Sequence, residues 1–210
     1  MSFAITAFLT LFVVIDPVGL MPIFITLAGK HPAEEQNRIA RQAVLIAAAI
    51  LLVFALLGEW LLRYLEISIE AFQITGGILL LKIAVDMVFG PVEQETVEEE
   101  KEALTIEDVS VFPLAIPLLA GPGTFASILI LTAKAHDPLS LAIVLAIAAV
   151  VLLIAYVLFR LSKQLADFLG HTGILVVTRL LGILLAALAV QYIIDGTIVV
   201  LRNALGLLQA

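Results

Sequence analysis

The stretch Asp16-Pro17-Val18-Gly19-Leu20-Met21-Pro22 interrupts a long apolar segment that runs from about residue 3 to residue 28. Proline removes a backbone donor and clashes with the preceding helical turn, and glycine adopts conformations that other residues avoid. A second stretch of this kind, Gly121-Pro122-Gly123-Thr124, follows Pro113 and Pro117 in another apolar segment. Together the two stretches predict helices that break near the middle of two otherwise apolar segments.

The segments around these breaks belong to a strongly apolar chain. Of its 210 residues 62% are hydrophobic and only 14% are charged, and the mean hydropathy is +1.18, whereas soluble domains are about 45–50% apolar. The formal charge of −7 has a local origin, because residues 93–108 hold eight acidic residues and one Lys. This composition excludes a soluble globular protein and a basic surface for nucleic acid.

Six segments are long enough to cross a membrane, which takes about 20 mostly apolar residues. The first lacks a charged n-region and a small-residue cleavage site, so we expect it to stay in the mature protein. The acidic run 93–108 is typical of a solvated linker, and it divides the chain into units 1–92 and 109–210 with three spans each. The predicted spans are 3–28, 42–62, 71–92, 109–133, 138–159 and 174–201.

Basic residues near the ends of the spans predict the orientation of the chain. Six of them fall on one side of the membrane and three on the other, which favours both termini outside and the linker 93–108 in the cytoplasm. Trp60 and Tyr64 suit the opposite, outer interface. We therefore expect a multi-pass protein of the cell (inner) membrane. The two sets are Lys30, Arg38, Arg41, Lys101, Arg160 and Lys163 inside, and Arg63, Lys134 and Arg202 outside.

The two groups of three spans share a sequence match. Residues 77–88 (GILLLKIAVDMV) and 182–193 (GILLAALAVQYI) align at an offset of 105 with six identical residues in twelve, and the same offset places Asp16-Pro17 on Gly121-Pro122. Because each group has an odd number of spans, the second enters the membrane upside down. The sequence thus predicts an all-α integral membrane protein of six helices in two inverted three-helix repeats, typical of many secondary transporters.

The order of residues within each break indicates where a second half-helix begins. Asp followed by Pro is a preferred helix start, with Asp as the N-cap, so we expect a half-helix from Asp16. Gly121-Pro122 offers the equivalent start without an acid. Half-helix N-termini expose N–H groups and the positive end of a dipole, which suits a carboxylate. In inverted repeats the two starts meet near the midplane, with space for a small anion or zwitterion.

Each break also has a simpler interpretation. A Pro-Gly break can serve only to kink a helix or to let helices pack closely, and the Asp16 carboxylate can be a cap alone. The functional alternative is that this carboxylate contacts a substrate ammonium, a coupling cation or a proton. Duplication of the break at matching positions favours a cavity, because unsatisfied backbone groups are not tolerated in lipid.

The third span contains further candidates. Lys82 and Asp86 are one helical turn apart and predict an ion pair on an internal face, which either holds helices together or relays protons. Together with Asp16 they are the candidates for coupling. Thr75 and Gly76 are candidates to line the cavity, although small residues more often serve close helix packing.

Other classes of function have little support. The chain has no Cys and only three His residues, each beside charged or turn residues, so no metal site is predicted. A Gly-x-Ser-x-Gly elbow and a His-Glu-x-x-His pair are absent from the sequence, which argues against an enzyme. A channel would need a continuous polar pathway, and few polar residues recur at regular positions along a span.

The residues at the breaks also carry a family resemblance. The segments 16–24 (DPVGLMPIF) and 117–124 (PLLAGPGT) resemble the MarC family of bacterial and archaeal membrane proteins, and residues 75–80 (TGGILL) are similar to the third span of that family. The resemblance covers essentially the whole chain. It implies that matching residues at the breaks border a substrate site. These are Asp16, Gly19, Gly121, Gly123 and Thr124, and with Pro17, Thr75 and Gly76 they make up the predicted substrate site.

The resemblance also implies a function. Characterised members of the family are SnatA-type transporters of small neutral amino acids such as glycine and alanine, which use an electrochemical gradient. We therefore expect a secondary transporter that works by alternating access, coupled to H⁺ or Na⁺ and without another cofactor. A proton-coupled exporter of another small metabolite is the alternative. The expected partners are the substrate and the lipid bilayer, and homo-oligomerisation is left open.

Overall fold

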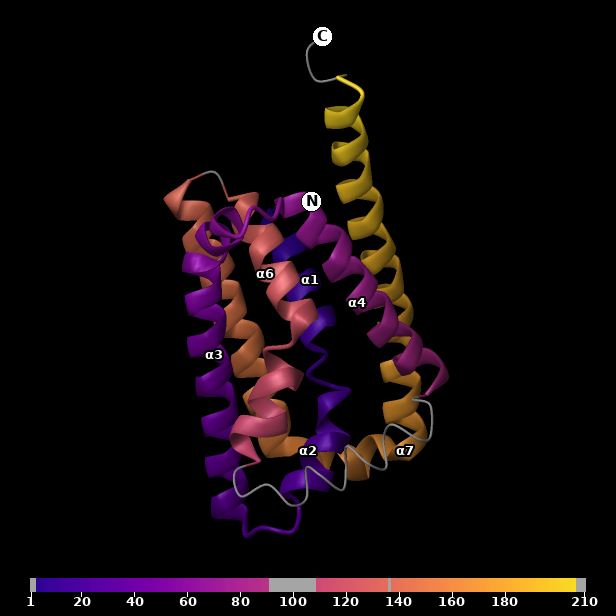
Figure 1. Cartoon of the computed structure of the whole chain (residues 1–210). Coiled ribbons are helices and arrows are strands. Elements are labelled where there is room, and N and C mark those ends of the chain that lie inside the picture. Colours follow the sequence, from indigo (N-terminus) through magenta and orange to yellow (C-terminus); the bar gives the residue numbers. More distant parts are fainter. Residues whose placement is uncertain (1–2, 91–108, 136, 207–210) are drawn as a thin grey trace.

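The computed structural model describes residues 3–90, 109–135 and 137–206 (Figure 1). The predicted linker at 93–108 lies outside the described residues. Within the described part of the chain, every regular element is helical. The elements are α1 (Phe3–Ile15), α2 (Leu20–Ala28), α3 (Ala33–Tyr64), α4 (Ile69–Phe89), η1 (Ser110–Leu119), α6 (Pro122–Ala133) and α7 (Pro138–Ala204).

The helices match the predicted pattern of spans and breaks. Four helices are long and apolar enough to cross a membrane: α3, α4 and the two halves of α7, Pro138–Gly170 and Thr172–Ala204. Two further spans are bent pairs, α1 with α2 at 43° and η1 with α6 at 52°. The chain thus has four clear spans, or six when each bent pair counts as one. Both predicted breaks are confirmed.

Several predicted spans were shorter than the helices of the structure. The second span was predicted to begin at residue 42, but α3 begins at Ala33 because polar and charged residues extend the helix beyond its apolar part. The last two spans belong to one run of 67 residues, α7, interrupted only at Gly170, whose φ of 64° is in the left-handed region. The predicted loop between them is therefore a kink within continuous helical turns.

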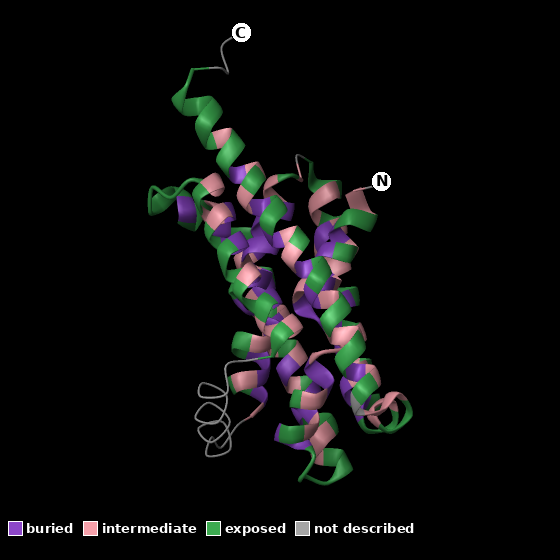
Figure 2. Cartoon of the chain, turned by 90° about the vertical axis from the view of Figure 1, so that its right-hand side faces the viewer, coloured by how far each residue is buried: buried purple, intermediate pink, exposed green. Residues whose placement is uncertain are grey.

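The broken helices lie at the centre of the bundle. Figure 1 shows α1 and α6 side by side between α3 and α4, with the start of α1 and the end of α7 at the same end of the molecule. The buried residues form a band along the inner faces of the helices, and the outer faces are exposed (Figure 2). Exposed large apolar side chains such as Leu57, Ile183 and Leu184 cover these outer faces, as expected of surfaces that contact lipid.

Two contacts fix the first half of α7 against the rest of the bundle. The rings of Phe24 in α2 and Phe159 in α7 stack with their centroids 4.8 Å apart. The Tyr156 hydroxyl donates a hydrogen bond of 2.8 Å to Oδ1 of Asn37 in α3. Together these contacts hold α2 and the beginning of α3 against the same face of α7.

Glycines in α4 and α7 make a reciprocal contact. A Cβ at Gly77 would lie 2.7 Å from the carbonyl oxygen of Ala189 and 2.8 Å from the side chain of Ile193. A Cβ at Gly182 would lie 3.0 Å from the side chain of Val88 and 3.3 Å from the carbonyl oxygen of Ala84. At the offset of 105, Ala84 corresponds to Ala189 and Val88 corresponds to Ile193. Two neighbours of Gly182 are therefore the counterparts of the two neighbours of Gly77. Two antiparallel helices related by a two-fold axis make contacts of this kind.

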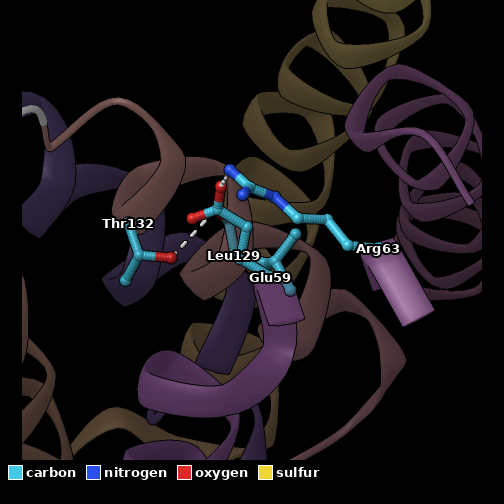
Figure 3. Close-up of polar contacts among 4 residues, drawn as sticks. All are labelled: Glu59, Arg63, Leu129 and Thr132. Atoms are coloured by element: carbon cyan, nitrogen blue, oxygen red, sulfur yellow. Dashed lines mark hydrogen bonds and ion pairs between the residues drawn. The ribbon is translucent and has the colours of Figure 1, made fainter. Parts of the chain in front are cut away.

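Aromatic and charged residues gather at the end of the bundle where α1 begins. The rings of Trp60 and Tyr64 stack with centroids 5.7 Å apart, and both side chains are largely exposed. On the same helix, Glu59 and Arg63 form an ion pair beside Leu129 and Thr132 of α6 (Figure 3). Tyr and Trp are enriched where membrane meets water, so this end of α3 marks the interface that the sequence predicted for Trp60 and Tyr64.

Candidate functional site

The first break is built around Asp16. This residue has a φ of 46°, in the left-handed region that Asp tolerates better than most side chains. Its Oδ1 accepts a hydrogen bond of 3.1 Å from the Gly19 amide, and its carbonyl accepts one of 3.1 Å from the Leu20 amide. Asp16 is only 9% exposed and Pro17 is buried. The break therefore places a carboxylate inside the helix bundle, within the membrane-spanning region.

The predicted start of the second half-helix at Asp16 needs correction. The regular helix α2 begins at Leu20, four residues later, and Pro17, Val18 and Gly19 form a turn before it. The carboxylate of Asp16 nevertheless caps this turn, because it accepts from an amide three residues along, as an N-cap does. Asp16 is a cap as predicted, but of the turn that precedes the helix.

The second break leaves a helix start without a side-chain cap. Helix α6 begins with Pro122 in its first turn, as predicted, and Gly121 stands at the N-cap position with no side-chain hydrogen bond. The Thr124 hydroxyl donates to the Leu119 carbonyl across the break, at 3.1 Å. The first amides of a helix have no partner within it, so those of Gly123 and Thr124 present a partial positive charge inside the bundle.

The segment before this break is irregular. Phe112 and Ile116 interrupt the π-helical η1 with extended backbone, at φ and ψ of −128° and 128°, and of −127° and 126°. Each precedes a proline, and the residue before a proline avoids helical backbone conformations. The peptide bonds Phe112–Pro113 and Ile116–Pro117 are cis. The prolines thus explain why η1 does not continue smoothly into α6.

The two breaks lie side by side. A Cβ at Gly123 would clash with Cδ2 of Leu80 in α4 and would lie 3.5 Å from Cγ1 of Val14, two residues before Asp16. The first turn of α6 therefore packs against the last turn of α1. The structure thus places Asp16, Pro17 and Gly19 at one break and Gly121, Gly123 and Thr124 at the other, and the two breaks meet where Gly123 packs against Val14.

The predicted residues of the third span divide into two groups. Gly76 is buried, and a Cβ there would clash with the Cβ of Ala126 in α6, so Gly76 packs one turn away from the second break. Thr75 is exposed, and its hydroxyl donates to the Ala71 carbonyl at 3.0 Å. Thr75 therefore lies on another side of α4 than Gly76, because one residue along a helix turns the side chain by about 100°.

The charged pair of the third span does not mark an internal face. Lys82 is exposed, and Asp86 is only partly buried. The carbonyl of Asp86 accepts from the Gly90 amide at the C-terminal end of α4, 2.9 Å away. The two residues thus lie towards the surface of α4, near its C-terminal end, and not on a buried internal face.

Four buried polar residues near the breaks escaped the sequence analysis as a group. Thr10 in α1, Gln73 in α4 and Ser127 in α6 are 6%, 8% and 0% exposed. The hydroxyl of Tyr192 in α7, also buried, lies close to those of Thr10 and Ser127. The signal was present in the sequence as Gln73 and Tyr192, which are polar residues inside apolar runs. Only the fold shows that the hydroxyls of Thr10, Ser127 and Tyr192 come together.

Metal ligands and a pocket outside the breaks are the other features that could hold a ligand. Across residues 3–90, 109–135 and 137–206, no three His, Cys, Asp or Glu side chains come together as metal ligands. An apolar pocket of about 180 Å³ opens between α3, α6 and the first half of α7, lined by residues such as Leu51, Ile128 and Leu152. Its lining is almost wholly apolar, so it offers nothing to hold a polar substrate.

Known proteins match the chain over nearly its full length. The family described as "MarC family integral membrane protein" matches residues 1–201. A UPF0056 membrane protein of Methanocaldococcus jannaschii is 40% identical over 197 residues, which is 93% of this chain and 96% of that protein. The UPF0056 membrane protein YhcE of Escherichia coli is 36% identical and covers 90% and 89% of the two chains. YvbG of Bacillus subtilis, another UPF0056 membrane protein, is 36% identical over 93% and 94%. No solved structure matches the chain.

Proposed function

The chain belongs to the MarC family of integral membrane proteins, and from that premise we propose that it is a secondary transporter of small neutral amino acids. One observation carries the proposal. Two broken helices lie side by side in the bundle, with a carboxylate at one break and an uncapped helix start at the other. Unsatisfied backbone groups are costly in a membrane, and transporters place substrates at such breaks.

The asymmetry of the two breaks fits a zwitterion. The turn before α2 already contains a carboxylate, since Asp16 Oδ1 accepts from Gly19, whereas no acidic side chain stands at the start of α6. We assign the substrate carboxylate to the amides of Gly123 and Thr124, because a helix N-terminus attracts negative charge. The substrate ammonium is assigned to Oδ2 of Asp16. A neutral amino acid supplies both groups at once.

The packing around the breaks supports a small side chain. Leu80 and Val14 close the space beside Gly123, and Ala126 closes the space beside Gly76, so that even a methyl group at either glycine would need a neighbour to move. A substrate held at the amides of α6 therefore has little space for atoms beyond its backbone. Glycine and alanine fit this description better than leucine.

The reciprocal glycine contact supports an arrangement of two inverted repeats, 1–92 and 109–210. Gly77 and Gly182 are equivalent in the sequence match, and each contacts the counterparts of the other's neighbours across an antiparallel pair of helices. In our proposal the axis of the repeats passes through this contact, and one repeat rocks against the other to open the paired breaks to each side in turn. The termini face the outside of the cell membrane.

Uptake into liposomes tests the proposal directly. The purified protein is reconstituted, a proton or a sodium gradient is imposed, and radiolabelled glycine is followed with excess unlabelled alanine or leucine as competitor. We expect gradient-driven uptake that alanine suppresses more strongly than leucine, and the effective gradient identifies the coupling ion. Absence of uptake with either gradient, in protein shown to be folded and inserted, would remove small neutral amino acids as the imported substrate.

A further inference from the structure

Four of the buried polar residues outside the breaks lie on helices that pack against one another. Thr10, Gln73, Ser127 and Tyr192, here called the polar cluster, come from α1, α4, α6 and α7. The hydroxyls of Thr10, Ser127 and Tyr192 lie close together. Apolar residues such as Val13, Ile130 and Ala189 surround Tyr192. A set of polar side chains on four different helices is therefore enclosed in an apolar part of a membrane protein.

The register of the helices brings Gln73 to the same level. Along α4, Leu80 lies beside Gly123 and Gly76 beside Ala126, so Gln73 faces the next turn of α6, which contains Ser127 to Ile130. On its other side, α4 contacts α7 at two places. Gly77 lies beside Ile193, and Glu70 lies beside Gly196. Gln73 lies between these two contacts along α4. Positions three and four apart share a helix face, and Gln73 is three and four residues from Gly76 and Gly77.

One donor of the cluster, Nε2 of Gln73, is buried without a hydrogen bond within the described residues. Oγ of Ser127 is buried close to the Tyr192 hydroxyl but makes no hydrogen bond of ordinary geometry. A buried donor without an acceptor is energetically costly and uncommon in folded proteins. Lipid supplies no acceptor, so a polar side chain inside a membrane protein must pair with another protein group or with water. Nε2 of Gln73 is thus a buried donor that lacks an acceptor oxygen in this conformation, whereas the hydroxyls of the cluster can both donate and accept.

The cluster lies on one side of the breaks along the helices. Ser127 is four residues beyond Gly123 along α6, and Thr10 is six residues before Asp16 along α1, both towards the end where α1 begins. At that end the Glu59–Arg63 ion pair lies beside Leu129 and Thr132 (Figure 3). Thr132 is five residues beyond Ser127, or about 7–8 Å at about 1.5 Å per residue.

We propose that Thr10, Gln73, Ser127 and Tyr192 form a hydrophilic access site between the paired breaks and the membrane face on which α1 begins. The ligand is a hydrogen-bond-accepting oxygen, supplied by water or by the carboxylate of a substrate in transit. In the conformation described, the Gly76–Ala126 and Gly58–Leu129 contacts keep α4 and α3 against α6 and close the site. The inference rests on the proposed function, since alternating access requires opening towards each face.

Cysteine labelling tests the access site, because the natural chain has no cysteine. Ser127→Cys and Thr10→Cys are compared with Ala47→Cys, a fully buried position among apolar side chains of α3. A membrane-impermeant thiosulfonate is added to the face on which α1 begins. We expect both cluster variants to react at least about tenfold faster than Ala47→Cys, because a minor open state is populated at roughly 0.1–10%. Rates equal to that of Ala47→Cys would overturn the access site.

Added glycine distinguishes the two sources of the oxygen, substrate carboxylate and water, and the variant Gln73→Leu tests the unpaired donor. Slower labelling of Ser127→Cys in the presence of glycine supports passage of the carboxylate, and labelling that glycine leaves unchanged supports water. Gln73→Leu should raise the melting temperature, because it removes an unpaired donor, and should slow the labelling of Thr10→Cys. A lower melting temperature would mean that Gln73 is paired and would contradict the proposal. Labelling needs no transport, so a reactive Ser127→Cys in a protein that does not carry amino acids keeps the access site and removes only the proposed substrate.

Discussion

At the scale of single residues, the account depends on the two oxygens of Asp16. One oxygen accepts from Gly19 and holds the turn before α2, and the other is assigned to the substrate. Because Asn keeps an acceptor oxygen but carries no charge, the two roles can be separated. A cap alone would tolerate the change to Asn, as both residues are good N-caps.

We predict that Asp16→Asn abolishes glycine uptake and leaves the protein folded. The expected loss follows from removal of the charge that holds the ammonium, since hydrogen bonds to charged groups contribute about 1.5–3 kcal/mol. Uptake into liposomes and the melting temperature are measured together. Glu59→Gln is the matched control, because Glu59 pairs with Arg63 on the surface of α3. Normal uptake by Asp16→Asn would reduce Asp16 to a structural cap.

Gly123 is the second residue on which the site depends. Any side chain there meets Leu80, so Gly123→Ala should lower the stability by about 1–3 kcal/mol, as overpacking does in a close-packed interior. Leu80→Ala in the same protein should restore part of that loss, because it removes the clash. Thermal melting of the two single variants and the double variant gives the coupling. Strictly additive losses would show that the two positions do not touch.

At the scale of the helices, the sequence predicted the breaks well because proline and glycine act locally. It located Gly121-Pro122 as the start of α6, but it placed the start of α2 four residues early, since the turn at Pro17 to Gly19 depends on the conformation of Asp16. The side of the helix on which a given residue lies was less predictable from the sequence. Thr75 and Gly76 are neighbours in sequence, yet only Gly76 turns inward, and no apolar pattern around them distinguishes the two.

Recognition of the polar cluster required the fold itself. Thr10 and Ser127 are single hydroxyl residues in apolar helices, and such residues often bond to their own helix backbone. The sequence offered Gln73 and Tyr192 as polar residues within spans, but it did not show that four helices bring them together. The charged residues Lys82 and Asp86 indicated an internal polar face more strongly than any of these four residues, and the structure places both towards the surface.

The reciprocal contact between α4 and α7 leads to a paired prediction. Gly77→Val and Gly182→Val should lower the melting temperature by similar amounts, because each introduces a side chain against backbone and side-chain atoms of the facing helix. Ile183→Val, on the exposed side of α7, is the control. Melting curves in detergent provide the measurement. A large loss for one glycine and none for the other would count against equivalent positions in two repeats.

At the scale of the whole molecule, the number of spans determines the sides of the membrane. With each bent pair counted as one span, the six crossings place the start of α1 and the end of α7 on the same side, and Figure 1 shows both at one end of the bundle. The balance of Lys and Arg predicts that this side is outside. The loop between α2 and α3, at Lys30, then faces the cytoplasm.

Reporter fusions test this arrangement in cells. Alkaline phosphatase, which is active only outside the cytoplasm, should be active when fused after Asn203 and inactive when fused after Lys30. The reverse reporter, a green fluorescent protein that folds in the cytoplasm, should give the opposite pattern. Activity of the phosphatase at both positions would be incompatible with an odd number of crossings between Lys30 and Asn203, and activity at Lys30 alone would reverse the orientation.

The central claim is that a zwitterion lies between the paired breaks, with its carboxylate at the start of α6 and its ammonium at Asp16. Competition for radiolabelled glycine binding to the purified protein tests both contacts at once. Glycolate keeps the carboxylate and glycinamide keeps the ammonium. The account predicts that each competes about 10- to 100-fold more weakly than glycine or alanine, because each loses one charged contact of about 1.5–3 kcal/mol. Competition by either analogue as strong as that of glycine would contradict the account.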